Sequence, residues 1–432
     1  MLVIESPKRS ADTSSGFGET YSYYAGYSLR FAEQLLEHLP RNSDSLVLDP
    51  WNGSGTTTVA AARAGYPSVG FDLNPVMVVV AKARMLRPST YPSILPIWDK
   101  IKAECIQCDA VPRNTPDPLR DWFDEVGIRA FRTLEKSIKS HLVIGAEDRT
   151  ASPLDYGHLS DLAAFFYISL FRVARRLTTC FRSSNPTWLR RPRTEAERVS
   201  IRLRALLDAV DEELHHTLAS QDRRLIADNS KQANSHLSTC SSERLNLPGN
   251  SIDVVLTSPP YCTRIDYAVA TSVELAVLGY ERKTTFAVLR DSLMGTTTVP
   301  KVEPPINRSL GQTCRTLLKD ISEHNSVASN TYYLKNHIQY FVSLQKSISE
   351  ITRVLRPWGM ATFVVQDSVY KDVHNDLPAI VTEMCRDLGL RDFQRDDFPT
   401  GASIASINMK SRRYKPVGFK PTESVISFYK HP

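Results

Sequence analysis

Residues 45–56 read SLVLDPWNGSGT, and this stretch decides the fold. The run 45–49 predicts a short buried strand, and the Ala-rich stretch 57–64 after the loop predicts a helix. A second short strand is predicted over 68–72, after Gly65. Strand, glycine-containing turn, helix and strand form one βαβ unit, which is typical of a parallel sheet with a ligand site at the carboxyl ends of its strands.

The turn inside this unit is suited to close contact with a ligand. Gly53 and Gly55 have no Cβ, so the backbone can approach a bound molecule. Asp72 ends the second strand, where an acid can accept hydrogen bonds from a ribose diol, although it could also be a plain helix cap. The loop lacks both the third glycine of a dinucleotide fingerprint and the lysine of a P-loop. We therefore expect an adenosyl ligand without phosphates.

A second loop follows another apolar strand. Residues 252–256 read IDVVL and lead into TSPPY at 257–261. Two prolines stiffen this loop and remove two backbone donors. Taken alone, such a sequence after a strand would indicate only a rigid turn. Ser258 and the Pro259 carbonyl are expected to accept the two N–H bonds of a base amino group, which turns its nitrogen toward a sulfonium methyl. Tyr261 is expected to stack on a base flipped out of the duplex.

Composition narrows the class of protein. The 432 residues carry a formal charge of +6, which is compatible with a polyanionic partner. The seven cysteines are scattered and odd in number, which favours a reducing compartment. With no signal-peptide pattern and no run long enough for a membrane span, we expect a cytoplasmic protein. No metal is expected, because Cys105 and Cys108 lack a second pair at zinc spacing.

The pattern divides the chain into five segments. Residues 1–84 are an N-terminal arm and the cofactor-binding half of the sheet domain, and 85–222 are a largely helical insertion. Residues 223–280 are the catalytic half, with strands predicted at 224–227 and 252–257. Residues 281–335 are a variable segment that faces the substrate, and 336–432 complete the sheet domain. Both 85–222 and 281–335 are candidates for reading DNA sequence.

The helical insertion contains a strongly basic stretch. Ten arginines and two glutamates lie between residues 171 and 204. The stretch lacks lysine and includes Trp188, which favours contact with phosphates over a solvated helical face. We expect the contacts to come from Arg190, Arg191 and Arg193.

Three motifs together resemble the amino-group DNA methyltransferases, the enzymes that methylate cytosine N4 or adenine N6. They are DPWNGSGT at 49–56, FDLNP at 71–75 and SPPY at 258–261. The resemblance covers about 1–84, 223–280 and 336–432. It implies an α/β fold with a Rossmann-like, mostly parallel sheet of about seven strands, S-adenosyl-L-methionine as cofactor and DNA as partner.

The resemblance also assigns residues to roles. It implies a cofactor site formed by Asp49, Trp51, Gly53, Gly55, Thr56, Asp72 and Asp228. Within that site Asp72 would bind the ribose and Asp228 would lie beside the adenine amino group. It implies a catalytic loop formed by Ser258, Pro259, Pro260 and Tyr261. Residues 24–36 resemble the segment that packs over the cofactor, and 423–430 resemble the closing strand.

Several functions remain open. Ser258 favours cytosine N4, because adenine enzymes more often have Asp-Pro-Pro-Tyr, and N6-adenine methylation is the alternative. RNA base methyltransferases share the chemistry but commonly carry an RNA-binding domain ahead of the cofactor loop. A protein glutamine methyltransferase would usually have asparagine in place of Ser258. A silent DNA-binding partner would not need these competent residues. A restriction endonuclease or a defence system is a candidate partner.

Overall fold

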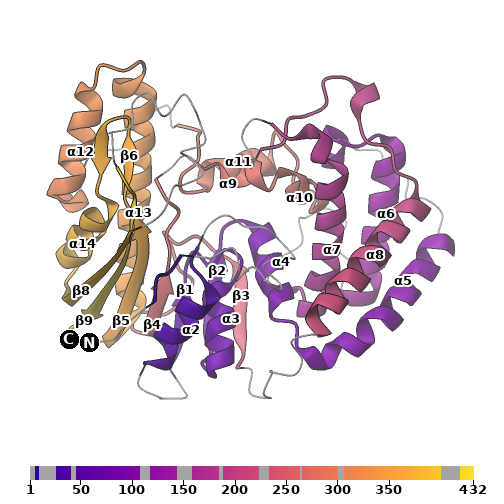
Figure 1. Cartoon of the computed structure of the whole chain (residues 1–432), viewed down its shortest axis with the longest axis horizontal. Coiled ribbons are helices and arrows are strands. Elements are labelled where there is room, and N and C mark those ends of the chain that lie inside the picture. The colour runs from indigo at the N-terminus through magenta and orange to yellow at the C-terminus, as the bar shows by residue number, and fades with distance from the viewer. Residues whose placement is uncertain are drawn as a thin grey trace.

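The sheet of this protein has seven strands in the order β3-β2-β1-β4-β5-β9-β8 (Figure 1). The computed structural model describes residues 5–8, 26–39, 45–107, 117–143, 158–183, 188–222, 233–262, 265–299, 306, 308–399 and 419–432. The five parallel strands are β1 (Val47–Asp49), β2 (Ser68–Asp72), β3 (Ser235–Thr239), β4 (Ile252–Thr257) and β5 (Leu355–Gln366). β9 (Thr422–Lys430) pairs antiparallel with both β5 and β8 (Leu390–Pro399), so β9 alone runs against the other strands. This order confirms the predicted mostly parallel α/β sheet.

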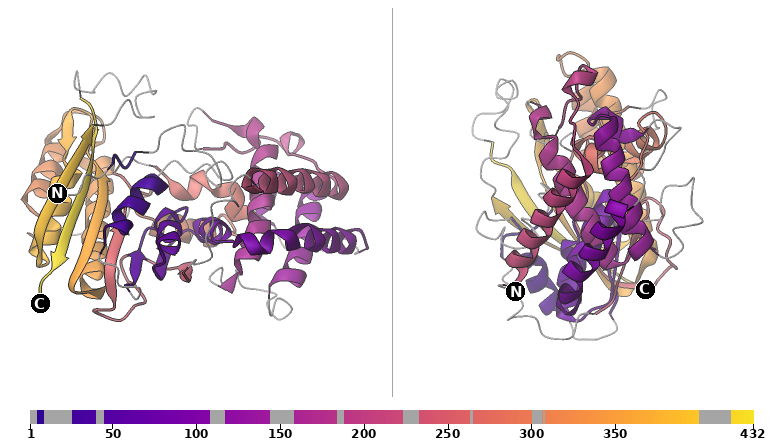
Figure 2. Two further views of the ribbon diagram at one scale, coloured as in Figure 1. Left: turned by 60° about the horizontal axis from the view of Figure 1, so that its bottom comes forward. Right: turned by 90° about the vertical axis from the view of Figure 1, so that its right-hand side faces the viewer.

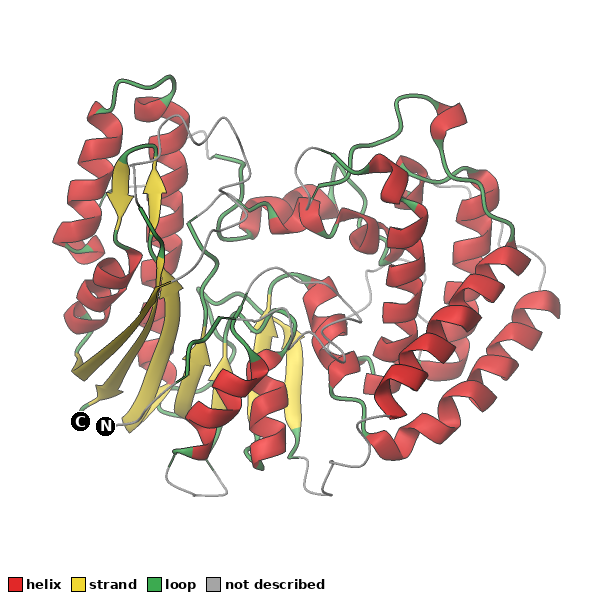
Figure 3. Ribbon diagram, in the orientation of Figure 1, coloured by secondary structure: helices red, strands yellow, loops and turns green. Residues whose placement is uncertain are grey.

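Helices cover both faces of the sheet (Figure 3). Successive side chains of a strand point to opposite sides, so apolar residues on both faces need a layer of helices to bury them. Val47 of β1 is buried in one apolar cluster with residues of α2 (Leu29–Glu37) and α3 (Thr56–Ala64). Leu48, the next residue, is buried in another cluster with residues of α12 (Gln312–Glu323), α13 (Leu334–Val354) and α14 (Leu377–Asp387). A small hairpin of β6 (Ser368–Tyr370) and β7 (Val373–Asn375) adjoins this second layer.

A group of helices stands beside the sheet domain (Figure 2). Between residues 85 and 222 the main helices are α5 (Ile94–Gln107), α6 (Glu125–Leu142), α7 (Asp161–Leu177) and α8 (Leu203–Asp222), here called the helical module. Its apolar core also takes in α4 (Pro75–Arg84), α10 (Ser272–Val277) and Leu289 of α11 (Thr285–Ser292). The module is thus packed against helices that come directly from the cofactor and catalytic halves.

The strand predicted at 224–227 falls outside the described residues. The third parallel strand is β3, which begins at Ser235 and pairs with β2. Within the part of the chain that the structure describes, no helix has the length and apolarity to cross a membrane.

Candidate active site

A cavity lies at the carboxyl ends of the parallel strands, where the strand order reverses between β1 and β4. It encloses about 970 Å³ of space, including the part that opens to solvent. The two loops predicted from the sequence meet there. From the first loop and β2 the lining residues include Asp49, Trp51, Gly53, Thr56 and Asp72, and from the second they are Ser258, Pro259, Pro260 and Tyr261.

Gly55 serves the packing of the first loop. It is the N-cap of α3 with a φ of 83°, a conformation that residues with a side chain rarely adopt. A Cβ at this position would lie 2.9 Å from the Cβ of Ala81 in α4. Glycine is therefore required here so that α3 and α4 can approach each other and the loop can turn toward the cavity.

Asp49 joins the two loops at the base of the cavity. Its buried carboxylate accepts hydrogen bonds from the Thr57 hydroxyl, from Thr257 Oγ1 at 2.6 Å and from the Trp51 backbone at 3.1 Å. Thr257 directly precedes Ser258, so this bond fixes the start of the catalytic loop to the start of the cofactor loop. Burial raises the pKa of Asp49 to about 6, and the bonds from the two threonines oppose that rise.

Asp72 holds the cofactor loop from the next strand. Its carboxylate accepts from the backbone N–H of Gly53 at 3.0 Å and of Asn74 at 2.8 Å. Burial raises its pKa to about 7, and the nearby Asp49 carboxylate adds to the rise. The two carboxylates thus face one cavity, and hydroxyl groups that donated to Asp72 would stabilise its ionised form.

The catalytic loop is held from both sides. Tyr340 of α13 donates a hydrogen bond to the Pro260 carbonyl at 2.7 Å, and Tyr261 donates to Glu423 of β9 at 2.9 Å. The carbonyl held by Tyr340 is that of Pro260, not that of Pro259, which the predicted mechanism uses. Burial raises the pKa of the Tyr261 hydroxyl well above its usual range, so this group stays a donor.

The sequence reasoning missed the residues that follow β3. Asp228 lies outside the described residues, and β3 begins after it, at Ser235. The residues that do follow β3 and line the cavity are Cys240, Ser241, Ser242 and Glu243. The strand SHLST has a single buried apolar residue, Leu237, which is too weak a signal to locate it in advance.

The predicted phosphate-contacting arginines are not among the residues that line this cavity. Arg190 pairs with Glu197 at 3.1 Å and lies over the ring of Phe181 at 5.3 Å. Arg191 lies 4.0 Å from Asp121, and the backbone of Arg193 donates to Glu197. All three side chains are exposed on the helical module.

Comparison with known proteins finds a matching family model and several relatives. Residues 7–83 match the family model for N6- and N4-type enzymes, described as DNA methylase. The Type II methyltransferase M.BsoBI of Geobacillus stearothermophilus is 25% identical over 277 residues, which make up 60% of this chain and 52% of the relative. The Type II methyltransferase M.AvaI of Nostoc sp. is 26% identical over 173 residues, 36% of this chain and 34% of the relative. Over residues 7–83 this chain is therefore similar to the N6- and N4-type DNA methylases.

The chain spans about half the length of M.BsoBI and a third of M.AvaI. A SAM-dependent methyltransferase from Methanosarcina mazei superposes on it with a TM-score of 0.30 and 9% identity, covering 90% of this chain and 94% of that chain. The cofactor expected from the sequence is S-adenosyl-L-methionine.

The cavity fits this cofactor by its chemistry. Its lining includes three carboxyl groups, those of Asp49, Asp72 and Glu243, and none of the described lining residues is lysine or arginine. Such a lining suits a ligand that carries sulfonium and ammonium charges but no phosphate. The apolar side chains of Leu73 and Met77 line the same cavity and offer a surface to a purine.

Proposed function

We propose that this protein transfers a methyl group from S-adenosyl-L-methionine to N4 of a cytosine that is flipped out of DNA. The observation that carries the proposal is the meeting of the Ser258–Tyr261 loop with the cofactor loop in one cavity, joined through Asp49 and Thr257. The family matches support the amino-group chemistry and DNA as the substrate.

The loop residues have distinct tasks in this reaction. The lone pair of a cytosine amino group is delocalised into the ring and becomes nucleophilic as the nitrogen turns toward sp³ geometry. Ser258 Oγ and the Pro259 carbonyl would accept the two N–H bonds and hold that geometry. The bound cofactor supplies an electrophilic methyl group. The ring of Tyr261 would stack on the flipped base, and its bond to Glu423 would keep the ring in place.

The preference for cytosine rests on Ser258. A hydroxyl can accept from an amino hydrogen and also donate to the adjacent ring N3, whereas an ionised carboxylate only accepts. The family resemblance of Ser-Pro-Pro-Tyr points the same way. N6-adenine methylation is the alternative outcome of the same loop.

We propose a restriction endonuclease as a partner and the cytoplasm as the location. Both relatives are named Type II methyltransferases, which supports a restriction endonuclease as a partner. The six cysteines that the structure describes are free, which supports the cytoplasmic location expected from the sequence.

Transfer of label from tritiated cofactor tests the proposed substrate class. Purified protein is incubated with mixed-sequence duplex DNA or with RNA of the same sequence, and cofactor binding is measured in parallel. We expect label in DNA. Label in RNA alone would favour an RNA base methyltransferase. A protein that binds the cofactor but transfers no label, even to DNA taken from cells without DNA modification, would favour a silent DNA-binding partner.

We further propose that the helical module contacts DNA phosphates through Arg190, Arg191 and Arg193. Arg191 and Arg282 both lie near Asp121, at distances of 4.0 Å and 3.4 Å, so the arginine segment adjoins the stretch that follows α10. This places exposed positive charge on the same side of the module as a segment that leads from the catalytic loop.

Replacing these three arginines by glutamine should weaken DNA binding and reduce its salt dependence. The slope of log K against log salt should fall by about 0.9 for each phosphate contact that is lost. Arg356→Gln is the control, because Arg356 pairs with Asp253 at the amino end of β4, away from the cavity. A triple variant with the wild-type salt slope would return this segment to a solvated surface.

A further inference from the structure

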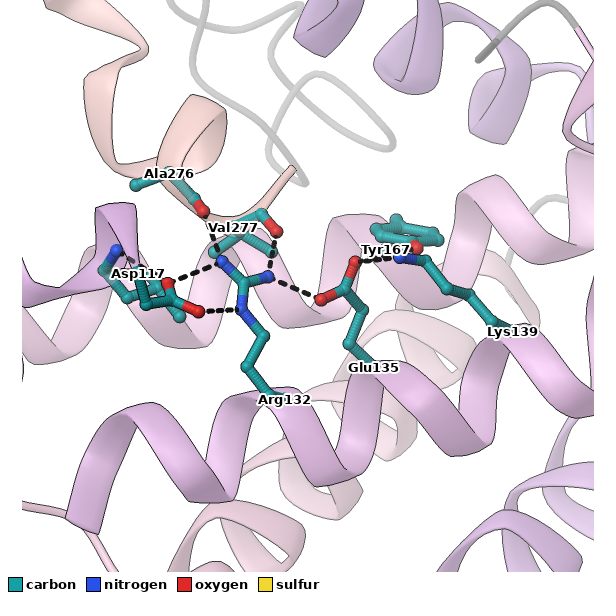
Figure 4. Close-up of polar contacts among 8 residues, drawn as sticks. Asp117, Arg132, Glu135, Lys139, Tyr167, Ala276 and Val277 are labelled. Atoms are coloured by element: carbon teal, nitrogen blue, oxygen red, sulfur yellow. Dashed lines mark hydrogen bonds and ion pairs between the residues drawn. The ribbon is translucent and has the colours of Figure 1, made fainter. Parts of the chain in front are cut away.

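Two short helices follow the catalytic loop, and side chains of the helical module form hydrogen bonds with both. They are α9 (Tyr267–Ala270) and α10 (Ser272–Val277). Helices this short end in carbonyl groups that have no partner within the helix. Arg132 of α6 and Arg175 of α7 donate hydrogen bonds to such carbonyls, and Figure 4 shows the contacts of Arg132.

Arg132 is almost fully enclosed, with 4% of its surface exposed. Its guanidinium makes a two-pronged ion pair with Asp117, with both N···O distances at 2.8 Å, and pairs with Glu135. The same group donates to the carbonyls of Ala276 at 2.8 Å and Val277 at 2.5 Å. The five N–H bonds of the guanidinium therefore all have acceptors, two of which are the last carbonyls of α10.

The surroundings of Arg132 balance its charge. Lys139 pairs with Glu135 at 2.7 Å, and Tyr167 of α7 donates to the same carboxylate at 3.3 Å (Figure 4). Two cations thus face two carboxylates, those of Asp117 and Glu135. A buried ionic cluster contributes little net stability compared with apolar packing, but its bond directions fix one geometry. The geometry fixed here is the position of α10 relative to α6.

Arg175 makes the second set of contacts with α9 and α10. Its guanidinium pairs through both carboxylate oxygens with Glu274 of α10, a residue that is fully buried. It also donates to the carbonyl of Ala270, the last residue of α9, at 2.6 Å. One arginine therefore holds the end of α9 and the body of α10 together against α7.

The helices α9 and α10 also contact the cofactor cavity. Thr271, between α9 and α10, accepts a hydrogen bond from the side chain of Asn74 at 2.9 Å. The backbone of Asn74 donates in turn to Asp72. Tyr267, the first residue of α9, lines the cavity itself. A shift of α9 and α10 would therefore move one wall of the cavity, the loop at Asp72 and the downstream end of the catalytic loop.

We propose that Arg132 and Arg175 are positioning residues of the methylation site, through which the helical module sets the place of α9 and α10. This inference rests on the proposed function. It gives the module a task in methyl transfer that is separate from DNA contact, because neither arginine is on the exposed segment 190–193.

Arg175→Gln tests the proposal against a matched control, Arg172→Gln. Arg172 lies one turn earlier on α7. It pairs at 2.9 Å with Glu213 of α8, so this ion pair lies inside the module and does not involve α10. Both variants lose one arginine–glutamate pair of the same helix. We expect Arg175→Gln to lower kcat by about tenfold or more, since small displacements at a reacting centre are costly, and Arg172→Gln to change it by less than about twofold. Assays run well below both melting temperatures.

Amide hydrogen exchange gives a readout that does not depend on activity. In Arg175→Gln, exchange should rise in residues 265–278, and S-adenosylhomocysteine should bind more weakly, whereas Arg172→Gln should resemble the wild type in both. The double variant Arg175→Gln/Glu274→Gln should be no worse than Arg175→Gln alone, because both changes remove the same contact.

Thr271 supplies an independent test of the link to the cavity. Thr271→Val removes the hydroxyl that Asn74 contacts and should weaken S-adenosylhomocysteine binding, and Thr271→Ser should restore it. Equal effects of Arg175→Gln and Arg172→Gln on exchange and cofactor affinity would overturn the proposal. A wild-type protein that fails to methylate DNA would overturn the proposed function instead. The comparison of hydrogen exchange and cofactor affinity would still decide whether Arg132 and Arg175 are positioning residues.

Discussion

Ser258→Ala should lower the rate of methyl transfer by about 10² to 10³ while cofactor binding persists, the size of effect seen when one transition-state hydrogen-bonding partner is removed. Ser258 lines the cavity next to Thr257, whose hydroxyl holds Asp49. Alanine leaves that bond in place and removes only the acceptor for the base amino group. The loss should therefore appear in kcat, measured at saturating DNA and cofactor.

The control for this variant is Ser251→Ala, at the opposite end of the same strand. Ser251 donates to the Pro248 carbonyl at 2.7 Å and lies on the amino side of β4. It should leave kcat within about twofold of the wild type, as most surface substitutions do. A fully active Ser258→Ala enzyme would contradict the mechanism, because no acceptor would then be needed at that position.

Asp72→Ala should weaken cofactor binding by about 1 to 3 kcal/mol, which is a rise of roughly 5- to 150-fold in Kd. The change removes the acceptor proposed for the ribose and leaves the N–H groups of Gly53 and Asn74 without this partner. Asp72→Asn keeps one acceptor oxygen and should lose less. Calorimetric titration with S-adenosylhomocysteine measures both, with Asp253→Asn at the amino end of β4 as control.

The same titration at several pH values tests the ionisation of Asp72. Its pKa in the free protein is raised to about 7 by burial. Ligand hydroxyls that donate to the carboxylate favour the ionised form, so binding releases a proton. Affinity should therefore rise with pH up to about 7 and then level off, and the rise should shrink in Asp72→Asn. Unchanged affinity in Asp72→Ala would remove this residue from the cofactor site.

The loops of the site could be predicted from sequence because their signals are local. Gly53, Gly55 and the two prolines act through backbone conformation, and the apolar runs beside them indicate strands without knowledge of the rest of the chain. The helices α7, α13 and α14 were predictable for the same reason, since each shows helical spacing of apolar residues.

The sheet edges and the long-range contacts could not be predicted in the same way. Both β3 and β8 are edge strands, and β8 reads LRDFQRDDFP, a charged sequence typical of an exposed edge. The arginine-rich stretch shows its charges in the sequence but not their partners. Arg172 and Arg175 belong to that stretch, yet their partners lie on other helices, Glu274 being 99 residues away from Arg175. Only the folded chain separates these two from the exposed arginines at 190–193.

The identity of the methylated base tests the central claim most directly. Duplex DNA without prior modification is incubated with the protein and S-adenosyl-L-methionine, digested to nucleosides and analysed by mass spectrometry against authentic standards. Our account predicts N4-methylcytosine, formed by the wild type and nearly absent with Ser258→Ala. N6-methyladenine as the sole product would contradict the assignment of cytosine, and 5-methylcytosine would contradict the amino-group mechanism as a whole.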